Sequence, residues 1–461
     1  MEILLVAAVS LLFASTNQLH VITQWFARPA GTYFTGIAHS LPDYFLYTDL
    51  MAQGAAGNLW TAAHFTNEPM AKTWIYWFNA LLGWLGNLIG LSPFGTYNVS
   101  LFFLVIGLCL LWYYLTKLLY PTNRFLRLTS WIMILTASSF AWNGSLLGQF
   151  WFSPTPALNR LGGVPHQVFG TIVFLLLAIF FSRKSLFMIP LAVLASTANP
   201  IQMALFLCAA AITTTRKNIV PFSILVLLGV AGAWATNRAF DLPVLQAAKA
   251  WENAQVVSVS LWQFILSMGP IAFLMPFGIK PFLKEKTVLR MLLFSYGVLS
   301  ILVFFSPLPK LLGTANVRWL HPASYGMLGI LSSEGLLAIS QGKIKTILLF
   351  MYLLLTIPSL SVQIQARANS SDLNYIPIAV IEKLNTIKKT IRDGVVLTHP
   401  SLPYDVLVPT FTGLTSFTGH PIHTLYPNVK EKLRQDFFSG KMTEEQKKQF
   451  LSDHNITVIY E

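Results

Sequence analysis

The side chains best suited to acid–base chemistry lie together near the start of the chain, in LPDYFLYTDLMAQGAAGNLWTAAHFTNEP (residues 41–69). This stretch carries Asp43, Asp49 and Glu68 among several aromatic residues, although only 18 of the 461 residues are Asp or Glu. A positioned carboxylate that accepts a proton during a reaction typically contributes about 10² to 10⁴ to its rate. The stretch therefore predicts a candidate site for a general base.

Helical spacing separates the two aspartates of this stretch. If its first part forms a helix, Asp43 and Tyr47 share one face, whereas Asp49 lies about 120° around the helix from Asp43. Asp43 also follows a proline, so the alternative is that it caps the start of the helix. A capping carboxylate and a catalytic one do not exclude each other, and both readings of Asp43 stay open.

The composition indicates a membrane protein. Hydrophobic residues make up 54% of the chain and charged residues only 11%, which is too apolar for a water-soluble core. The net charge of +13 comes from small Lys and Arg clusters between apolar runs. Because they form no basic stripe, we expect no nucleic-acid partner. Cys109 and Cys208 each lie in an apolar run, which predicts neither a disulfide framework nor a cysteine metal site.

The apolar runs have the length of membrane-spanning helices. A hydrocarbon core about 30 Å thick requires roughly 17 to 25 apolar residues per helix. Runs of this kind are Ile3–Thr23, Asn98–Leu115, Leu128–Trp142, Val168–Phe181, Pro221–Thr236, Leu261–Gly278, Val288–Phe305, Trp319–Ile339 and Thr346–Ser361. The run from Leu186 to Thr214 is too long for one span, and Asn199-Pro200 predicts two short helices there. We expect an all-α polytopic membrane protein with about eleven transmembrane helices, the first of them uncleaved.

Basic residues beside the spans predict the orientation. These residues are Lys117, Arg124, Arg127, Arg183, Lys184, Arg216, Lys217, those from Lys280 to Arg290, Lys343 and Lys345. They fall on one side, which would be cytoplasmic, only if residues 74–91 do not cross the membrane. That segment is rich in Trp at one end and interrupted by Gly and Asn, so we expect an interfacial helix on the outer face. The N-terminus is then inside and the C-terminus outside.

Three segments are expected on the outer side: 27–97, 143–167 and 362–461. The last has no run long enough to span a membrane and regains Lys, Glu, Asp and Thr. Its pattern predicts a small extracytoplasmic α/β domain. The expected elements are a helix at 378–391, strands at 394–398, 406–408 and 456–460, and an amphipathic region at 429–450. We therefore expect a transmembrane module (1–361) that includes the first outer loop, and a separate domain (362–461).

Together these features resemble the GT-C superfamily of polytopic membrane glycosyltransferases, in particular little-characterised bacterial members. The first outer loop has Asp in a P-D-Y-x-x-Y setting, then Q-G-x-x-G, then F-T-x-E-P, then the aromatic interfacial segment. The late stretch VLTHPSLPYDVLVPTFTGLTSFTGHPIHTLYPNVKEKLRQDFFSG and the closing DHNITVIYE match as well. The resemblance covers nearly the whole chain.

The resemblance implies transfer of a sugar from a polyprenyl-phosphate donor to an extracytoplasmic glycan or glycolipid acceptor, with inversion. The first-loop aspartate of the superfamily matches Asp43, which would act as general base or as anchor of the acceptor. An attacking sugar hydroxyl must lose its proton as the new bond forms, and a carboxylate can take it. The secondary candidates are Tyr47, Asp49, Glu68 and His166.

The departing lipid phosphate gains negative charge, so a cation should face it. Arg318, in NVRWLHPASYG, is the first candidate, because a guanidinium can hold two phosphate oxygens. The alternative is that Arg318 reaches lipid headgroups. His321 could share its face, and Arg160, in NRLGGVPHQVFG, is a further donor-phosphate candidate.

The chain also departs from the superfamily pattern. Many members place a second acidic residue in the next outer loop, but residues 143–167 contain none. A divalent metal would need the first loop to fold back so that Asp43, Glu68 and His64 converge, so metal dependence stays open. The W-W-D-Y-G signature of oligosaccharyltransferases is absent, which argues against transfer to protein sequons.

Two rival functions remain: a non-catalytic lipid or glycan translocator, and a polymerase or ligase of surface polysaccharide. A coupled transporter should keep several ionisable residues at membrane depth, where each is costly. Only Glu334 lies well inside a predicted span, which favours an enzyme. We expect a multi-pass protein of a bacterial inner (plasma) membrane. The sequence does not indicate the sugar, the acceptor or the oligomeric state.

Overall fold

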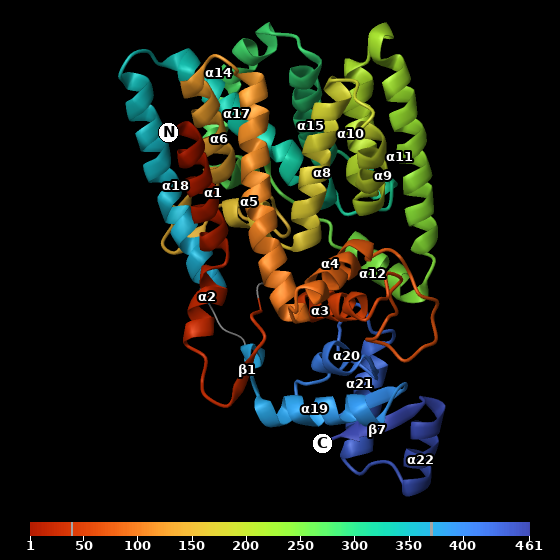
Figure 1. The fold of residues 1–461 in the computed structure, drawn as a ribbon. Helices are drawn as coiled ribbons and strands as arrows, with labels where there is room; N and C mark the ends of the chain where they lie inside the picture. Colours follow the sequence, from red (N-terminus) through yellow and green to blue (C-terminus); the bar gives the residue numbers. More distant parts are fainter. Residues whose placement is uncertain (38–39, 369–371) are drawn as a thin grey trace. The chain divides into compact units, whose positions relative to one another are not determined.

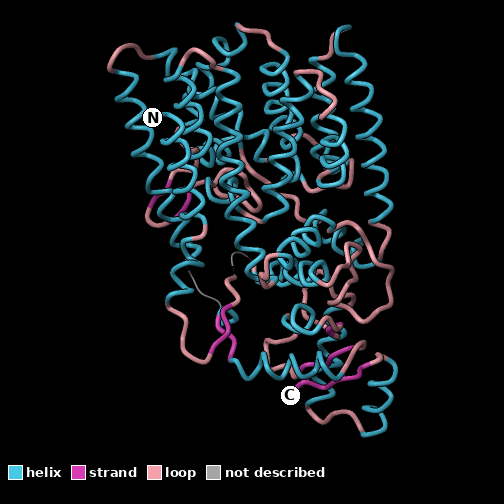
Figure 2. Tube along the Cα trace, viewed as in Figure 1, coloured by secondary structure: helices cyan, strands magenta, loops and turns pink. Residues whose placement is uncertain are grey.

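The computed structural model describes residues 1–37, 40–368 and 372–461, most of which form helices (Figures 1 and 2). The chain divides into two compact units. The membrane unit comprises Met1–Asn17, Leu101–Asn237 and Glu252–Ala368, and the loop unit comprises Gln18–Ser100, Arg238–Trp251 and Asn369–Glu461. The predicted division after residue 361 assigned the first outer loop to the membrane module. In the structure this loop groups with the C-terminal segment instead.

Most helices of the membrane unit lie in the predicted apolar runs, but the run Leu128–Trp142 is helical only to Thr136, and the run Leu261–Gly278 bends by 89° between Met268 and Ile271. The helices of this unit are α1 (Glu2–Asn17), α5 (Pro93–Leu119), α6 (Arg124–Thr136), α7 (Ala157–Gly162), α8 (Pro165–Ser182), α9 (Met188–Ala198), α10 (Pro200–Thr213), α11 (Ile219–Ala239), α13 (Leu261–Met268), α14 (Ile271–Lys284), α15 (Val288–Phe305), α16 (Leu308–Leu311), α17 (Pro322–Ile339) and α18 (Ile344–Ala368). Within the described residues, five helices are long and apolar enough to cross a membrane, or up to seven if each of two bent pairs is one span. The chain is therefore a membrane protein, while a total of about eleven spans stays a prediction.

The predicted break at Asn199-Pro200 is confirmed. Asn199 ends α9, and its side chain accepts the N–H of Gln202 at 3.1 Å to cap α10. Pro200 takes the first position of α10, where its missing N–H costs nothing. The same two residues thus stop one helix and start the next.

The acidic residue inside a predicted span is paired. Glu334, in α17, lies 3.5 Å from Nη1 of Arg290, in α15. Arg290 also donates to the carbonyls of Phe282 and Leu119 and pairs with Glu285 at 3.0 Å. A buried charge with such partners joins helices together, so Glu334 does not by itself indicate proton coupling.

The loop unit combines helices with short strands. Its helices are α2 (Leu19–Phe26), α3 (Leu41–Ala55), α4 (Trp77–Leu88), α12 (Pro243–Asn253, shared with the membrane unit), α19 (Ile378–Thr390), α20 (Leu407–Thr412), α21 (Pro427–Phe438) and α22 (Glu444–Asp453). β5 (Val395–Thr398) pairs in parallel with β6 (Thr415–Ser416) and β7 (Ile456–Tyr460), in the order β6-β5-β7. β1 (Thr32–Phe34) pairs antiparallel with β4 (Tyr375–Pro377), which connects the first loop to the C-terminal segment.

Most of the predicted C-terminal elements are present, and one is wrong. The helix at 378–391 and the strands at 394–398 and 456–460 correspond to α19, β5 and β7. The predicted strand at 406–408 belongs to α20 instead. A run of three apolar residues is too short for its periodicity to distinguish a strand from a buried helix.

Two glycines set the position of the acidic helix α3. A Cβ on Gly54, in α3, would come 1.9 Å from the carbonyl oxygen of Ala80, and one on Gly83, in α4, would come 2.0 Å from that of Met51. Only glycine permits backbones this close. The segment predicted as an interfacial helix (74–91) therefore forms α4 and packs directly against α3.

Candidate functional site

Two motifs that are far apart in the sequence lie side by side in the loop unit. The backbone N–H of Ser416 donates to the carbonyl of His64 at 2.8 Å. The hydroxyl of Thr424 donates to the carbonyl of Phe65, also at 2.8 Å. The F-T-x-E-P segment of the first loop therefore runs along the G-H-P-I-H-T turn of the C-terminal segment, and both contribute side chains to one site.

Asp43 lies in the first turn of α3 and is not its cap. The first helical bond runs from Tyr44 N to Ser40 O at 2.9 Å, so Ser40 is the N-cap and Asp43 the third helical residue. The capping alternative is thus wrong in position, although the helix dipole still favours a carboxylate there. The side chain of Asp43 is 43% exposed, so a substrate can reach it.

His420 faces this carboxylate through one defined ring nitrogen. Its Nδ1 accepts the backbone N–H groups of Ile422 at 3.1 Å and His423 at 3.0 Å. A nitrogen that accepts carries no proton, so the proton of the neutral ring sits on Nε2. Nε2 lies 3.6 Å from Oδ1 of Asp43 and is buried, with no hydrogen-bond partner among the described residues. The buried imidazole therefore presents an N–H donor to Asp43.

A second histidine and a tyrosine extend this polar row. The ring of His423 lies 4.7 Å from that of His420, and its Nε2 lies 3.4 Å from Oη of Tyr76. Burial lowers the pKa of His423 to about 3, with a further lowering by His420 and an opposing effect of Asp43. His423 is thus neutral near pH 7 and adds no charge beside the carboxylate.

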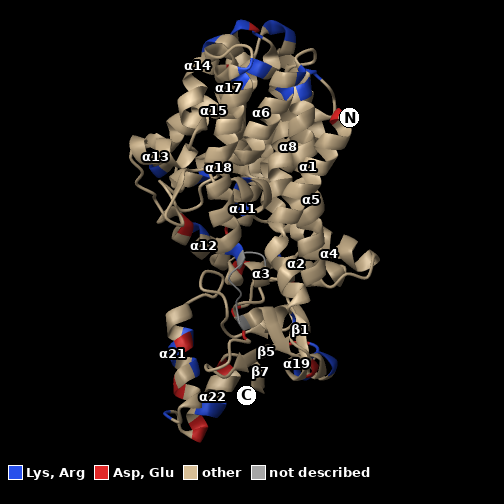
Figure 3. Cartoon of the chain, turned by 90° about the vertical axis from the view of Figure 1, so that its left-hand side faces the viewer, with Lys and Arg blue, Asp and Glu red and all other residues tan. Residues whose placement is uncertain are grey.

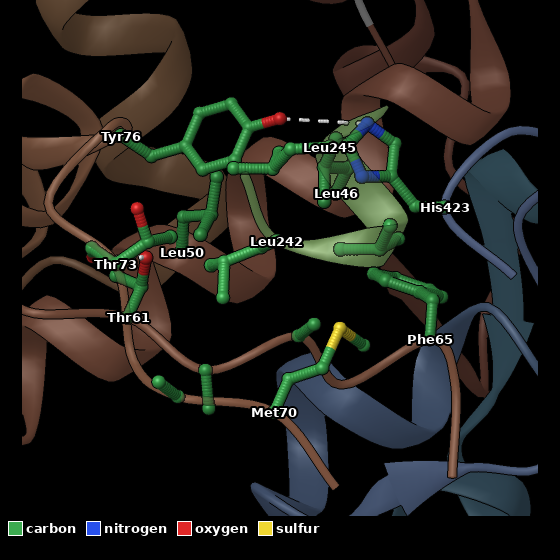
Figure 4. Close-up of a pocket in the computed structure, with 14 residues that line it drawn as sticks. Leu46, Leu50, Thr61, Phe65, Met70, Thr73, Tyr76, Leu242, Leu245 and His423 are labelled. Carbon is green, nitrogen blue, oxygen red and sulfur yellow. Dashed lines mark hydrogen bonds between the residues drawn. The ribbon is translucent and has the colours of Figure 1, made fainter. Parts of the chain in front are cut away.

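Tyr76 and His423 border a small cavity of about 20 Å³ (Figure 4). Its other walls are mostly apolar, with Leu46 and Leu50 from α3 and Leu245 from α12. This volume holds about one water molecule and neither a sugar nor a lipid chain. The exposed carboxylate of Asp43 is the part of the site that a substrate can reach.

Asp49 and His64 form a separate, buried pair. Asp49 is 1% exposed, and its carboxylate contacts Nδ1 of His64 at 3.0 Å and Nε2 of Gln53 at 2.9 Å. Burial acts to lower the pKa of His64, but the charge of Asp49 and its hydrogen bond outweigh burial and raise it. Asp49 is out of reach of a substrate and acts by holding His64.

Glu68 is also paired. Its Oε2 lies 2.7 Å from Nζ of Lys430, and it accepts a hydrogen bond from the hydroxyl of Thr66. Burial would raise the pKa of Glu68, but the hydrogen bonds from Lys430 and Thr66 lower it below its usual range. This pair joins the first loop to α21. Tyr47, one turn after Asp43 in α3, is partly buried.

The three side chains considered for a metal each have a different partner: His420 for Asp43, Asp49 for His64 and Lys430 for Glu68. Across residues 1–37, 40–368 and 372–461, no group of three or more His, Cys, Asp or Glu side chains could hold a metal ion. The loop does fold back as the metal hypothesis required, but it does not bring these three together.

Arg318 lies in the membrane unit and has a carboxylate partner. Its Nε and Nη2 donate to Glu252 at 2.5 and 2.7 Å, and its guanidinium lies 4.3 Å from the ring centroid of Phe152. A phosphate at Arg318 would have to displace Glu252. Since 66 residues separate Arg318 from Glu252, no spacing signal in the sequence points to the pair.

The other basic candidates of the membrane unit have structural contacts. His321 is buried and caps α17, with Nδ1 accepting the N–H of Ala323 at 3.2 Å. Arg160 is 2% exposed and donates to four backbone carbonyls, those of Pro154, Thr155, Ile134 and Ala137. His166 is the second residue of α8. The contacts of His321 and Arg160 leave little room for a phosphate.

His420, His423, Lys430 and Glu252 were not among the site residues expected from the sequence. The first three lie in the late stretch that carried the resemblance, where the two histidines stand three residues apart after Gly419. That H-P-I-H spacing, next to a short polar run, is the signal that could have pointed to them.

No family model and no curated protein match the chain. Fifteen chains of solved structures match it. One of them is the arabinofuranosyltransferase AftD from mycobacteria, with 14% sequence identity and a TM-score of 0.44 over 86% of this chain. The matched part covers 30% of that protein, so the present chain spans under a third of its length. A TM-score at this level carries no conclusion about activity.

Proposed function

We propose that this protein is a membrane glycosyltransferase in which Asp43 is the general base. It transfers a sugar from a polyprenyl-phosphate donor to an extracytoplasmic glycan or glycolipid, with inversion at the anomeric carbon. The observation that supports this most is the exposed carboxylate of Asp43 beside the buried Nε2–H of His420. A carboxylate that substrate can reach, with an N–H donor 3.6 Å away, suits proton abstraction from a hydroxyl.

The proposed reaction is a single displacement. The acceptor hydroxyl oxygen forms a bond to the anomeric carbon while the bond from that carbon to the phosphate oxygen breaks. The hydroxyl proton passes to an oxygen of Asp43, and the electron pair of the broken bond leaves with the polyprenyl phosphate. Attack opposite the leaving group inverts the anomeric carbon. His420 presents its Nε2 to the carboxylate from 3.6 Å.

Arg318 is the proposed partner of the donor phosphate. Its guanidinium already donates two hydrogen bonds to the two carboxylate oxygens of Glu252. Two phosphate oxygens would bind in the same two-point geometry. The phosphate would replace Glu252 there, and the guanidinium would offset the charge that develops on departure. Arg160 and His321 take no part in this proposal, because the two Nη atoms of Arg160 donate to four backbone carbonyls and Nδ1 of His321 caps α17.

Localisation in a bacterial inner membrane belongs to the same proposal. Figure 3 shows Lys and Arg gathered at one end of the helices of the membrane unit. The excess of basic residues in cytoplasmic loops would place that end inside.

The translocator alternative loses its main titratable candidate at membrane depth, since Glu334 is paired with Arg290. A polymerase or ligase would use the same donor chemistry with a longer glycan.

The test is release of labelled polyprenyl phosphate from a panel of polyprenyl-phosphate sugars, with membrane extract as the acceptor. We expect Asp43→Asn to lower turnover by about 10² to 10⁴. Asp241→Asn is the matched control, since Asp241 is an exposed aspartate of the loop unit that pairs with Arg238. A wild-type protein that releases nothing would favour the translocator. Equal turnover in wild type and Asp43→Asn would mean that another group is the general base, and His64 would be the next residue to test.

A further inference from the structure

A hollow of the membrane unit lies on the second outer loop. It has a volume of about 670 Å³ and is lined by residues of the segment 144–153 together with Asn159 and Val362. The exposed Gln149, Trp151 and Phe152 line it, next to hydroxyl and amide groups. None of the described residues that line it is charged. The hollow is wide and open to the surface.

A rigid turn builds this loop. β2 (Ala141–Trp142) and β3 (Ser145–Leu146) form a hairpin joined by Asn143 and Gly144, both with positive φ (46° and 74°). Asn-Gly is the preferred pair for a two-residue turn of this kind. Gly148 then lies so close to α13 that a Cβ would come 2.3 Å from the carbonyl oxygen of Gln263. The hairpin is thus anchored to the helices beneath it.

Phe152 is held in an unusual backbone conformation. Its φ of 56° lies in the left-handed region, which an aromatic residue rarely adopts. The guanidinium of Arg318 lies over its ring, and Arg318 is itself paired with Glu252. Such conformations persist where the surroundings hold them, and they concentrate at ligand-binding positions. The ring is therefore preset as one wall of the hollow.

We infer that this hollow binds a neutral sugar ring. The C–H faces of a sugar pack on aromatic rings such as Trp151 and Phe152, and its hydroxyls exchange hydrogen bonds with amides such as those of Gln149 and Asn159. The lining itself carries no charge, although two cations lie against it: Arg367 donates to Oδ1 of Asn159 at 3.2 Å, and Arg318 lies over the ring of Phe152. This disfavours a cationic ligand. The inference deepens the proposed function, on which it rests, because it locates a sugar-binding subsite of the transferase.

The experiment measures saccharide binding to the full-length protein by calorimetry, in a detergent without a sugar headgroup. The probes are neutral disaccharides of glucose, galactose, mannose and arabinose. We expect Trp151→Ala and Gln149→Ala to bind the preferred disaccharide more weakly, the former by at least about tenfold. Trp142→Ala is the matched control and should bind like the wild type, because Trp142 is 75% exposed on the same hairpin but does not line the hollow.

A second arm identifies the source of the sugar. If a polyprenyl-phosphate sugar competes with the disaccharide and the same lipid phosphate without sugar does not, the hollow holds the donor sugar. If only the disaccharide binds, it holds the acceptor. Phe152→Gly removes the ring at a φ that glycine tolerates, so it should weaken binding without loss of folding.

The inference is overturned if no neutral saccharide binds the wild type, or if the Trp151 and Gln149 variants bind like Trp142→Ala. Its failure differs from failure of the proposed function. Turnover without saccharide binding would refute the hollow alone, whereas binding without turnover, retained in Asp43→Asn, would refute the enzyme alone.

Discussion

His420 offers a sharp test, because its two ring nitrogens have different tasks. Nδ1 accepts the N–H groups of Ile422 and His423, whereas Nε2–H faces Asp43 at 3.6 Å. In His420→Asn the amide oxygen can take the place of Nδ1, since asparagine accepts hydrogen bonds from backbone N–H groups two residues on. This variant keeps the turn and removes the donor to Asp43. His420→Ala removes both.

The expected magnitudes follow from this geometry. A hydrogen bond to a charged group contributes about 1.5 to 3 kcal/mol. Because 3.6 Å is longer than a formed hydrogen bond, we take the lower end, which corresponds to about a tenfold loss of turnover. His420→Ala also leaves two partly buried N–H groups without their acceptor, at about 0.5 to 1.5 kcal/mol each. The free energy of opening this turn should therefore fall by about 1 to 3 kcal/mol.

Two measurements separate the tasks: release of polyprenyl phosphate, and amide hydrogen exchange over residues 416–425. His420→Asn should turn over about tenfold more slowly with unchanged exchange, whereas His420→Ala should exchange much faster. Wild-type turnover in His420→Asn would refute a role of Nε2 at Asp43. Exchange as fast as in His420→Ala would refute Nδ1 as the anchor of the turn.

Two predictions concern the neighbouring ion pairs. Glu68→Gln leaves Lys430 buried without a carboxylate and should destabilise the loop unit by about 2 to 3 kcal/mol. This is below the usual cost of about 3 to 5 kcal/mol for breaking a buried ion pair, because Glu68 is partly exposed. Hydrogen exchange of α21 measures the loss, and the control Lys430→Met should cost less. The lowered pKa of Glu68 means that its stabilising contribution is present above the ordinary value of 4.5 and is lost as the pH falls below it. The raised pKa of His64 has the opposite sign, so its contribution is full below 6.5 and is lost as the pH rises through the folded-state value. Exchange at the N–H of Ser416, which donates to the carbonyl of His64, should therefore speed up at alkaline pH in the wild type beyond the intrinsic change, and Asp49→Asn should lose this pH dependence.

The helices could be predicted because length and apolarity suffice to define them. The run Val288–Phe305 matches α15 to the residue, and the Asn199-Pro200 break is a local signal. The grouping of the first loop with the C-terminal segment could not be predicted in this way. It depends on pairing between β1 and β4, whose strands are more than 300 residues apart and only three residues long.

In the candidate site, too, single residues could be predicted from the sequence, but their contacts with distant segments could not. Asp43 was identifiable because a carboxylate stands out in an apolar chain. Its partner His420 was not, because its role depends on a turn that fixes which ring nitrogen carries the proton. Arg318 could be identified from its charge. Its contacts could not, because Glu252, which accepts its hydrogen bonds, and Phe152, whose ring it covers, come from other segments.

Because Ser40 is the N-cap of α3 and Asp43 lies in its first turn, the two readings of Asp43 are separable by experiment. As a residue of the first turn, its carboxylate interacts with the helix dipole, which contributes about 0.3 to 1 kcal/mol at an exposed position. As a general base it would contribute about 10² to 10⁴ in rate, or about 3 to 5.5 kcal/mol at the transition state. Asp43→Asn should therefore lose far more transition-state stabilisation than folding stability. If hydrogen exchange at the start of α3 rises by as much as turnover falls, Asp43 serves the helix and the base lies elsewhere.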